Sequence, residues 1–210
     1  MNGWRELKLY IKMPAIKNFP AYRQYNNDTC GASALQMVLA YYGLDFKESF
    51  VAKIAGTVSS GTPIEGIKKV AKAFGLKITE GEMTVADLKK NIKNGVPTII
   101  GIQSWTKPGM DIEQEWHHGH FIVPIKYDRT RIYFADPAFP LRTYLTFTEL
   151  EKRWRDKDKK AGHWRRINHY GLAFSGKKPA FQPGLAVRIG RPKKRGKMFG
   201  LDYIDFSQIK

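Results

Sequence analysis

The residues that decide the fold are QYNNDTCGASALQMVLAYYG, at positions 24–43. Asp28 or Thr29 offers a side-chain oxygen that can cap a helix, and apolar residues then recur at helical spacing until Gly43 ends the pattern. The only cysteine of the chain, Cys30, therefore lies in the first turn of a predicted buried helix. Free backbone N–H groups and the helix dipole stabilise an anion there, so the sequence predicts a cysteine suited to act as a nucleophilic thiolate.

A lone cysteine is more often a small core residue, so this interpretation requires a base elsewhere in the chain. If residues 121–127 and 132–135 form a hairpin that turns at 128–129, His120 and Asp136 face each other directly, with Cβ atoms about 4.5–5.5 Å apart. The carboxylate would then fix the imidazole tautomer and stabilise its positive charge. His120 is the predicted base among the five histidines, which are at positions 117, 118, 120, 163 and 169.

A structural alternative for this pair stays open. A slip of one residue would place the two side chains on opposite faces of the sheet. Pro124 cannot donate to a ladder and indicates an edge strand or irregular pairing. In this alternative His120 is a satisfied edge histidine, and Asp136, which precedes Pro137, only begins a turn.

Gln24 lies six residues before Cys30 and supplies the remaining requirement of acyl transfer, a donor aimed at the oxyanion. Its side-chain amide and the Cys30 backbone N–H can form that pair of donors. Nucleophile, base, orienting carboxylate and oxyanion donor are the four parts that the reaction requires.

These segments resemble the bacteriocin-processing peptidases, papain-like cysteine proteases that remove double-glycine leader peptides where they are fused to exporters. Residues 24–35, with Tyr41-Tyr42-Gly43, resemble the catalytic-helix motif of that family. Residues 120–123 and 132–137 are similar to its His strand and Asp-Pro turn, and the resemblance spans roughly residues 20–155. It implies catalytic roles for Cys30, His120, Asp136 and Gln24.

The resemblance also implies an α+β, papain-like fold in which an N-terminal helical layer packs on a C-terminal antiparallel β-sheet, with the active site in the cleft between them. The residue pattern agrees, because helical signals fill the first half and strand signals the second. Helices are predicted at 46–55, after the capping box Thr62-x-x-Glu65, at 84–94 with the box Thr84-x-x-Asp87, and after Thr148-x-x-Glu151. Strands are predicted at 96–102, 121–127, 132–135 and 143–147, with one more at 171–174.

Length and composition fit a globular chain. With 210 residues, 42% of them hydrophobic and 26% charged, the chain fits one domain with an appendage and is not wholly disordered or collagen-like. A single cysteine excludes an internal disulfide. We expect a peptidase domain over residues 1–155, with an extended lead-in at 1–20. Residues 156–210 would be a basic extension, partly packed on the domain or flexible.

The net charge of +17 is concentrated in that extension, since residues 152–210 carry 17 basic and 4 acidic side chains. Three interpretations stay open: a solvated tail, an arm that binds nucleic acid or acidic lipid, or a segment that lies over the acidic loop 111–115. No nucleic-acid fold motif accompanies it, so nucleic-acid binding through this segment is a weak prediction.

The loop before His120 is the predicted substrate-binding region. Trp105, Trp116 and Gly119 lie in it, and loops that join scaffold strands often carry binding residues. The alternative is that the tryptophans cap the core. Zinc held by His117, His118, His120 and Cys30 is a further alternative, but adjacent histidines in an extended segment converge poorly on one ion, so we predict no metal.

Charged residues interrupt the first dozen positions, which disfavours a secretory signal. The longest mostly apolar runs, 37–44 and 96–102, are far shorter than the ~20 residues that span a membrane. We therefore expect a cytoplasmic chain without a transmembrane segment.

These observations predict a thiol-dependent endopeptidase that needs no cofactor and acts on a peptide or protein through an acyl-enzyme thioester. An acyl- or peptidyl-transferase using the same Cys-His-Asp site is an alternative within this chemistry. From a different class, the chain would be a non-catalytic peptidase-fold module with a basic arm that binds nucleic acid or protein.

Overall fold

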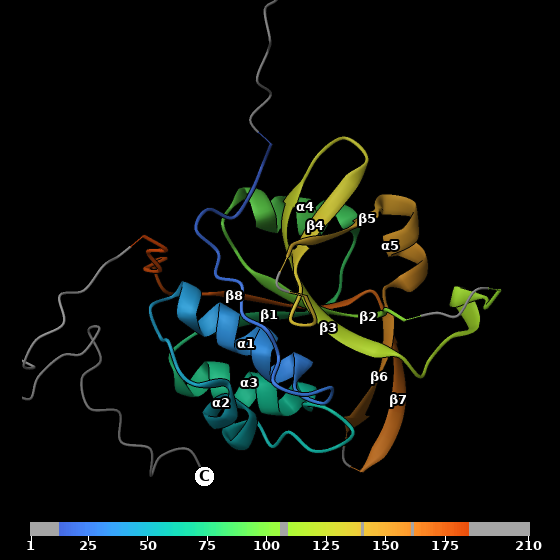
Figure 1. Ribbon diagram of the computed structural model, residues 1–210, viewed down its shortest axis with the longest axis horizontal. Coiled ribbons are helices and arrows are strands. Elements are labelled where there is room, and N and C mark those ends of the chain that lie inside the picture. The colour runs from blue at the N-terminus through green and yellow to red at the C-terminus, as the bar shows by residue number, and fades with distance from the viewer. Residues whose placement is uncertain (1–12, 106–108, 140, 161, 185–210) are drawn as a thin grey trace, which may run out of the picture.

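The computed structural model describes residues 13–105, 109–139, 141–160 and 162–184, and its elements form the predicted α+β fold (Figure 1). The helices are α1 Cys30–Tyr41, α2 Glu48–Ile54, α3 Ile64–Ala73, α4 Val85–Lys93, α5 Phe147–Arg153 and the 3-10 helix η1 Ile112–Gln114. The strands are β1 Lys77–Glu82, β2 Thr98–Gln103, β3 Gly119–Tyr127, β4 Arg131–Ala135, β5 Thr143–Thr146, β6 Arg155–Lys160, β7 His163–Asn168 and β8 Tyr170–Ser175.

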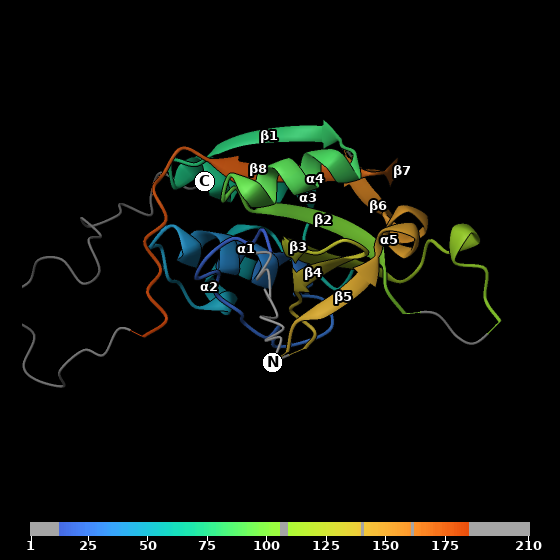
Figure 2. The same cartoon turned by 90° about the horizontal axis from the view of Figure 1, so that it is seen from above.

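Six strands form one antiparallel sheet in the order β1-β8-β2-β3-β4-β5, and β6 pairs with β7 in a separate hairpin. The first three helices lie on one face of the sheet and α4 on the other (Figures 1 and 2). The apolar side chains of α1 and α3 pack with those of β2, β3 and β8 in one core. Burial of this core fixes α1, which carries Cys30, against the strand that carries His120.

β8 is an internal strand, although it comes from the C-terminal quarter of the sequence. It lies between β1 and β2 and includes the strand predicted at 171–174. The Tyr42 hydroxyl at the end of α1 donates a hydrogen bond to the Phe174 carbonyl at 2.7 Å. The packed structure therefore continues past the boundary predicted at residue 155, at least to Ser175. Residues 185–210 of the predicted extension lie outside the described residues.

Two of the predicted helix starts differ from the structure. The box Thr84-x-x-Asp87 caps α4 as expected. Helix α5 instead begins two residues early, where Thr146 and Glu149 form the capping box. No side chain of its own first turn caps α3; the Ile64 N–H faces Asp158 Oδ1 of β6 at 3.4 Å. A distant carboxylate has replaced the local cap that Thr62 and Glu65 were expected to form.

The expectation that the first half is purely helical is also wrong, because β1 follows α3. Its residues, KITEGE, are mostly exposed, and the strand lies at the edge of the sheet beside β8. A polar edge strand lacks the apolar alternation by which a strand is recognised in a sequence.

Candidate active site

Cys30 is the first residue of α1 and a buried, free cysteine. Thr29 holds the N-cap position, but its hydroxyl donates to the Asn26 carbonyl at 3.1 Å and does not cap the helix. Close packing fixes this turn, since a Cβ on Gly31 would lie 2.8 Å from Thr62 Cβ and 2.9 Å from Phe121 Cδ2. The thiol therefore lies at the electropositive end of a rigid helix, where an anion is favoured.

His120 lies on β3 and is 4% exposed. Its Nε2 is 2.7 Å from Asp136 Oδ1, and the Cys30 thiol lies near enough to the ring to affect its pKa. Because Nε2 is occupied by the carboxylate, Nδ1 is the nitrogen left for the sulfur. Burial lowers the pKa of His120, but its hydrogen bonds and charge interactions with Asp136 and Cys30 outweigh this and raise the pKa to about 9.

Asp136 follows β4 and is held by donors in addition to the imidazole. The Ala138 N–H donates to Oδ1 at 2.9 Å, and the Thr143 hydroxyl of β5 donates to Oδ2 at 3.0 Å. Burial raises the pKa of Asp136, but the hydrogen bond and charge of His120, with these donors, lower it below its ordinary value. The carboxylate is therefore ionised and fixed in position at neutral pH.

The predicted register of the hairpin that carries this pair is wrong. Val123 pairs with Ala135 and Tyr127 with Ile132, with an irregularity between Pro124 and Lys126. Continued from Val123, this register sets Asp136 two residues from the position opposite His120. An offset of two keeps both side chains on one face, and the 2.7 Å contact forms diagonally.

Gln24 lies next to the Asp136 turn, because its backbone N–H donates to the Pro137 carbonyl at 2.8 Å. Its side-chain Nε2 donates to the Asn26 carbonyl at 2.7 Å, and its enclosed Oε1 accepts no hydrogen bond from the described residues. The structure thus places Gln24 in the loop that leads to Cys30, with its amide directed at that loop. Its role as oxyanion donor stays a prediction.

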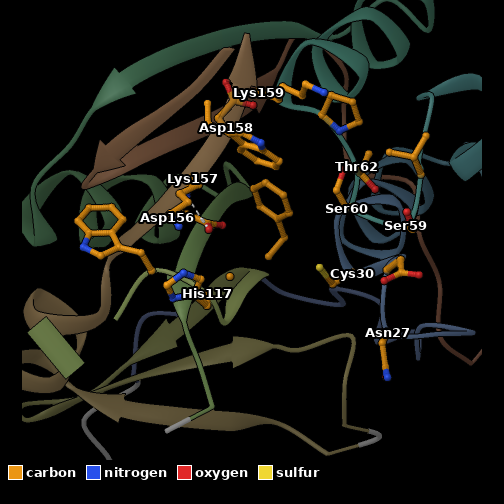
Figure 3. A pocket seen from close by; sticks show the side chains of 18 of the residues that line it. Asn27, Cys30, Ser59, Ser60, Thr62, His117, Asp156, Lys157, Asp158 and Lys159 are labelled. Carbon is orange, nitrogen blue, oxygen red and sulfur yellow. Dashed lines mark hydrogen bonds between the residues drawn. The ribbon is translucent and has the colours of Figure 1, made fainter. Parts of the chain in front are cut away.

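Two of the predicted substrate-binding residues share a hollow with the cysteine. Trp116 and Gly119 line a pocket of about 760 Å³ together with Cys30, the loop 58–63 and β6 (Figure 3). Trp105 is not among its lining residues. Its ring is 49% exposed and lies 6.0 Å from the His120 ring, centroid to centroid. The tryptophans therefore border the site on different sides.

The zinc alternative finds no support in this geometry. His117 and His118 each place a ring nitrogen within 3.3 Å of the Glu115 carboxylate, whereas His120 bonds Asp136. Across the described ranges, no three histidine, cysteine or acidic side chains are grouped so that they could hold a metal ion.

Two acidic residues of the site were missed in the sequence. Asp156 and Asp158 of β6 are buried and line the pocket, although both lie in the segment predicted to be a basic extension. The segment RDKDKK places its acids at alternate positions, which is the pattern of a strand with one buried face. This alternation is the feature of the sequence that could have identified both buried aspartates.

A model of the Peptidase C39 family matches residues 18–157, which is more than half of the chain. The chain belongs to the peptidase C39 family. The matched residues include the cysteine, the histidine and the aspartate that the structure brings together. The resemblance to bacteriocin-processing peptidases is therefore confirmed.

Relatives and solved structures place this C39 domain among peptidases. The pediocin PA-1 transport/processing ATP-binding protein PedD of Pediococcus acidilactici is 24% identical over 132 residues, which are 62% of this chain and 17% of that protein. A C39-like peptidase from Bacillus anthracis superposes with a TM-score of 0.63 at 16% identity, covering 80% of this chain and 100% of that one. A double glycine motif protease from an AMS/PCAT transporter, solved in complex with the leader peptide, gives a TM-score of 0.54 at 23% identity and covers 80% and 99% of the two chains.

At these identities the superpositions establish that the C39 fold is shared. In the described part of this chain, no helix has the length and apolar character needed to cross a bilayer.

Proposed function

We propose that the chain is a thiol endopeptidase that hydrolyses a peptide bond of a peptide or protein through an acyl-enzyme thioester. The observation that carries the proposal is the position of the Cys30 thiol at the N-terminus of α1, beside His120, whose Nε2 contacts Asp136 at 2.7 Å. Membership of the C39 family and the shared fold of double-glycine proteases support it.

In the first half-reaction the Cys30 thiolate attacks the carbonyl carbon of the substrate and forms a C–S bond. The Cys30 N–H and the Gln24 amide, once turned from the Asn26 carbonyl, donate to the oxyanion. His120 gives its proton to the leaving nitrogen as the C–N bond breaks. The amine product departs and a thioester remains.

In the second half-reaction the neutral His120 takes a proton from water, and the hydroxide adds to the thioester carbonyl. The C–S bond breaks, the acid product leaves, and the thiolate–imidazolium pair is restored. Asp136 keeps the imidazole in one orientation and stabilises its charge throughout. No step requires a metal or an organic cofactor.

The direct test is hydrolysis of a diverse peptide library, with products read by mass spectrometry. We expect new N- and C-termini at a restricted set of bonds, and none after the protein has been alkylated with iodoacetamide. Repeating the assay with added primary amines distinguishes the transferase alternative, because capture of the acyl group by the amine changes the product mass. If the protein cleaves no peptide of the library, the proposal is wrong.

The pH profile should report the raised pKa of His120. Because the ion pair needs the imidazolium, and His120 holds its proton up to about pH 9, kcat/KM should stay high through neutral pH and fall as the pH rises through about 9. The same proton contributes stability that is fully present below about pH 6.5 and is lost through about pH 9. Initial rates between pH 6 and 10 on an uncharged peptide measure the limb; a midpoint near 6.5 would contradict the ion pair.

A further inference from the structure

The pocket beside Cys30 contains a buried carboxylate that the proposed mechanism does not use. Asp156, on β6, is 7% exposed and lines the pocket of about 760 Å³ that the cysteine also lines. Figure 3 shows the Asp156 carboxyl group and the Cys30 thiol directed into one hollow from opposite sides. A ligand that fills this pocket would therefore contact both residues.

Only one oxygen of this carboxylate is occupied by the protein. Oδ1 accepts from the Lys157 backbone N–H at 2.7 Å and faces Gln103 Nε2 at 3.4 Å. Among the described residues none donates a hydrogen bond to Oδ2. Lys157 and Lys159 of the same strand also line the pocket, but no ion pair joins either of them to Asp156 among the described residues. The free oxygen is thus an acceptor on the pocket side.

Two neighbouring strands leave space for this carboxylate by having glycine there. A Cβ on Gly119 of β3 would lie 2.2 Å from Asp156 Oδ1, and one on Gly101 of β2 would lie 2.8 Å from Oδ2. Any side chain at either position would displace the carboxyl group. Gly119, a predicted substrate-binding residue, therefore contributes to the pocket by leaving space for the Asp156 carboxylate.

No lysine or arginine side chain among the described residues pairs with this carboxylate, and the charge of His120 is the one that favours its ionised form. Burial raises the pKa of Asp156 to about 7. The groups that lower this pKa most are the Lys157 N–H, His120 and Gln103, and none of them is a lysine or arginine side chain. Asp158, next on the same face, differs because Arg165 pairs with it at 2.9 Å. His120 is already bonded to Asp136, so its charge is shared between two buried carboxylates, and a cation brought by a ligand is bound favourably beside Asp156.

We propose that this pocket selects a polypeptide that carries a lysine or arginine side chain within a few residues of the bond attacked by Cys30, and that Asp156 receives the cation. The inference rests on the proposed peptidase function, because it treats the bound polypeptide as a substrate. The preference for a cation can nevertheless be measured as binding, without hydrolysis. It names Asp156 as a specificity-determining residue.

The test measures binding to the full chain carrying Cys30→Ala, so that hydrolysis does not interfere. Fluorescent peptides, chosen from sequences that the wild type cleaves or from a random library if it cleaves none, carry lysine, arginine or norleucine at each position in turn. We expect one position at which the cationic peptides bind about tenfold or more tightly than the norleucine peptide, as is typical of a hydrogen bond to a charged group. Adding Asp156→Asn should bring that ratio close to one.

Asp28→Asn is the matched control, because Asp28 lines the same pocket but is more exposed to water. Its charge is screened, so the ratio should change less than about twofold. A ratio near one at every position in the Cys30→Ala protein overturns the proposal, whether or not Asp156→Asn folds. A ratio that survives in a folded Asp156→Asn protein overturns the assignment to Asp156. Absence of cleavage by the wild type would instead contradict the peptidase function and leave these binding ratios measurable.

Discussion

Replacing Cys30 with alanine should lower peptide hydrolysis by about 10⁴-fold or more, because the reaction loses its only nucleophile. Removing one Sγ atom at the start of α1 leaves the packing of Gly31 against Thr62 and Phe121 in place. The free energy of unfolding should therefore change far less than the rate. Initial rates and thermal melting of the two proteins, measured side by side, check this prediction.

Cys30→Ser is the conservative companion of this variant. It keeps a hydroxyl in the same place, but a hydroxyl is not ionised by the helix terminus and the imidazole at neutral pH, so hydrolysis should stay near that of the alanine variant. Activity of Cys30→Ala above about a tenth of the wild-type rate would show that the chain hydrolyses peptides at another site, and the proposed function would be wrong.

Replacing Asp136 with asparagine should lower kcat by about 10²-fold or more and move the alkaline limb of the pH profile down from about 9. The neutral amide no longer stabilises the imidazolium, while burial continues to disfavour it. A general loss of structure would lower kcat without moving the midpoint of the alkaline limb. A shift of that midpoint therefore shows that the substitution acts on the charge state of His120. The measurement is kcat/KM against pH for both proteins.

Asp128→Asn is a matched control for this substitution. Asp128 is an aspartate of the same hairpin that accepts hydrogen bonds from the Thr130 and Arg131 backbone and the Tyr133 hydroxyl, but no contact joins it to His120. Its loss should leave the midpoint of the limb unchanged. If Asp136→Asn also leaves the midpoint unchanged, Asp136 does not set the charge state of His120.

The reacting groups were predictable from the sequence because each depends on local chemistry. Cys30 is identified by the helix start around it, and His120 and Asp136 by their places at the open end of a hairpin. The predicted hairpin register was wrong because the turn is longer than two residues. Tyr127 pairs with Ile132, and the Asp128 carboxylate accepts the backbone N–H groups of the turn.

The irregularity after Pro124 then corrects part of this difference, so that the final error is two residues and the facing sides are preserved. Pro124 indicates irregular pairing at this place in the sequence, but not the size or direction of the shift.

The residue proposed to determine substrate specificity was harder to predict from the sequence. The environment of Asp156 is made by Gly101, Gly119 and Gln103, which come from other strands more than 30 residues away. The alternation of acids in RDKDKK indicates a strand with one buried face, but it does not show which strands leave space for the carboxylate. The same holds for Asp158, which faces the start of α3 from β6, and for the strand β8, whose partners lie far from it in sequence.

The internal position of β8 has a consequence for biosynthesis. The ribosome delivers α1, β2 and β3 first, yet β1 has no neighbour on the sheet until the segment at 170–175 has emerged. Contacts of such wide sequence separation form slowly and late. A nascent chain that already carries Cys30 and His120 therefore still lacks the strand that anchors the end of α1, and proteolytic competence should arise only after nearly the whole described chain has been translated.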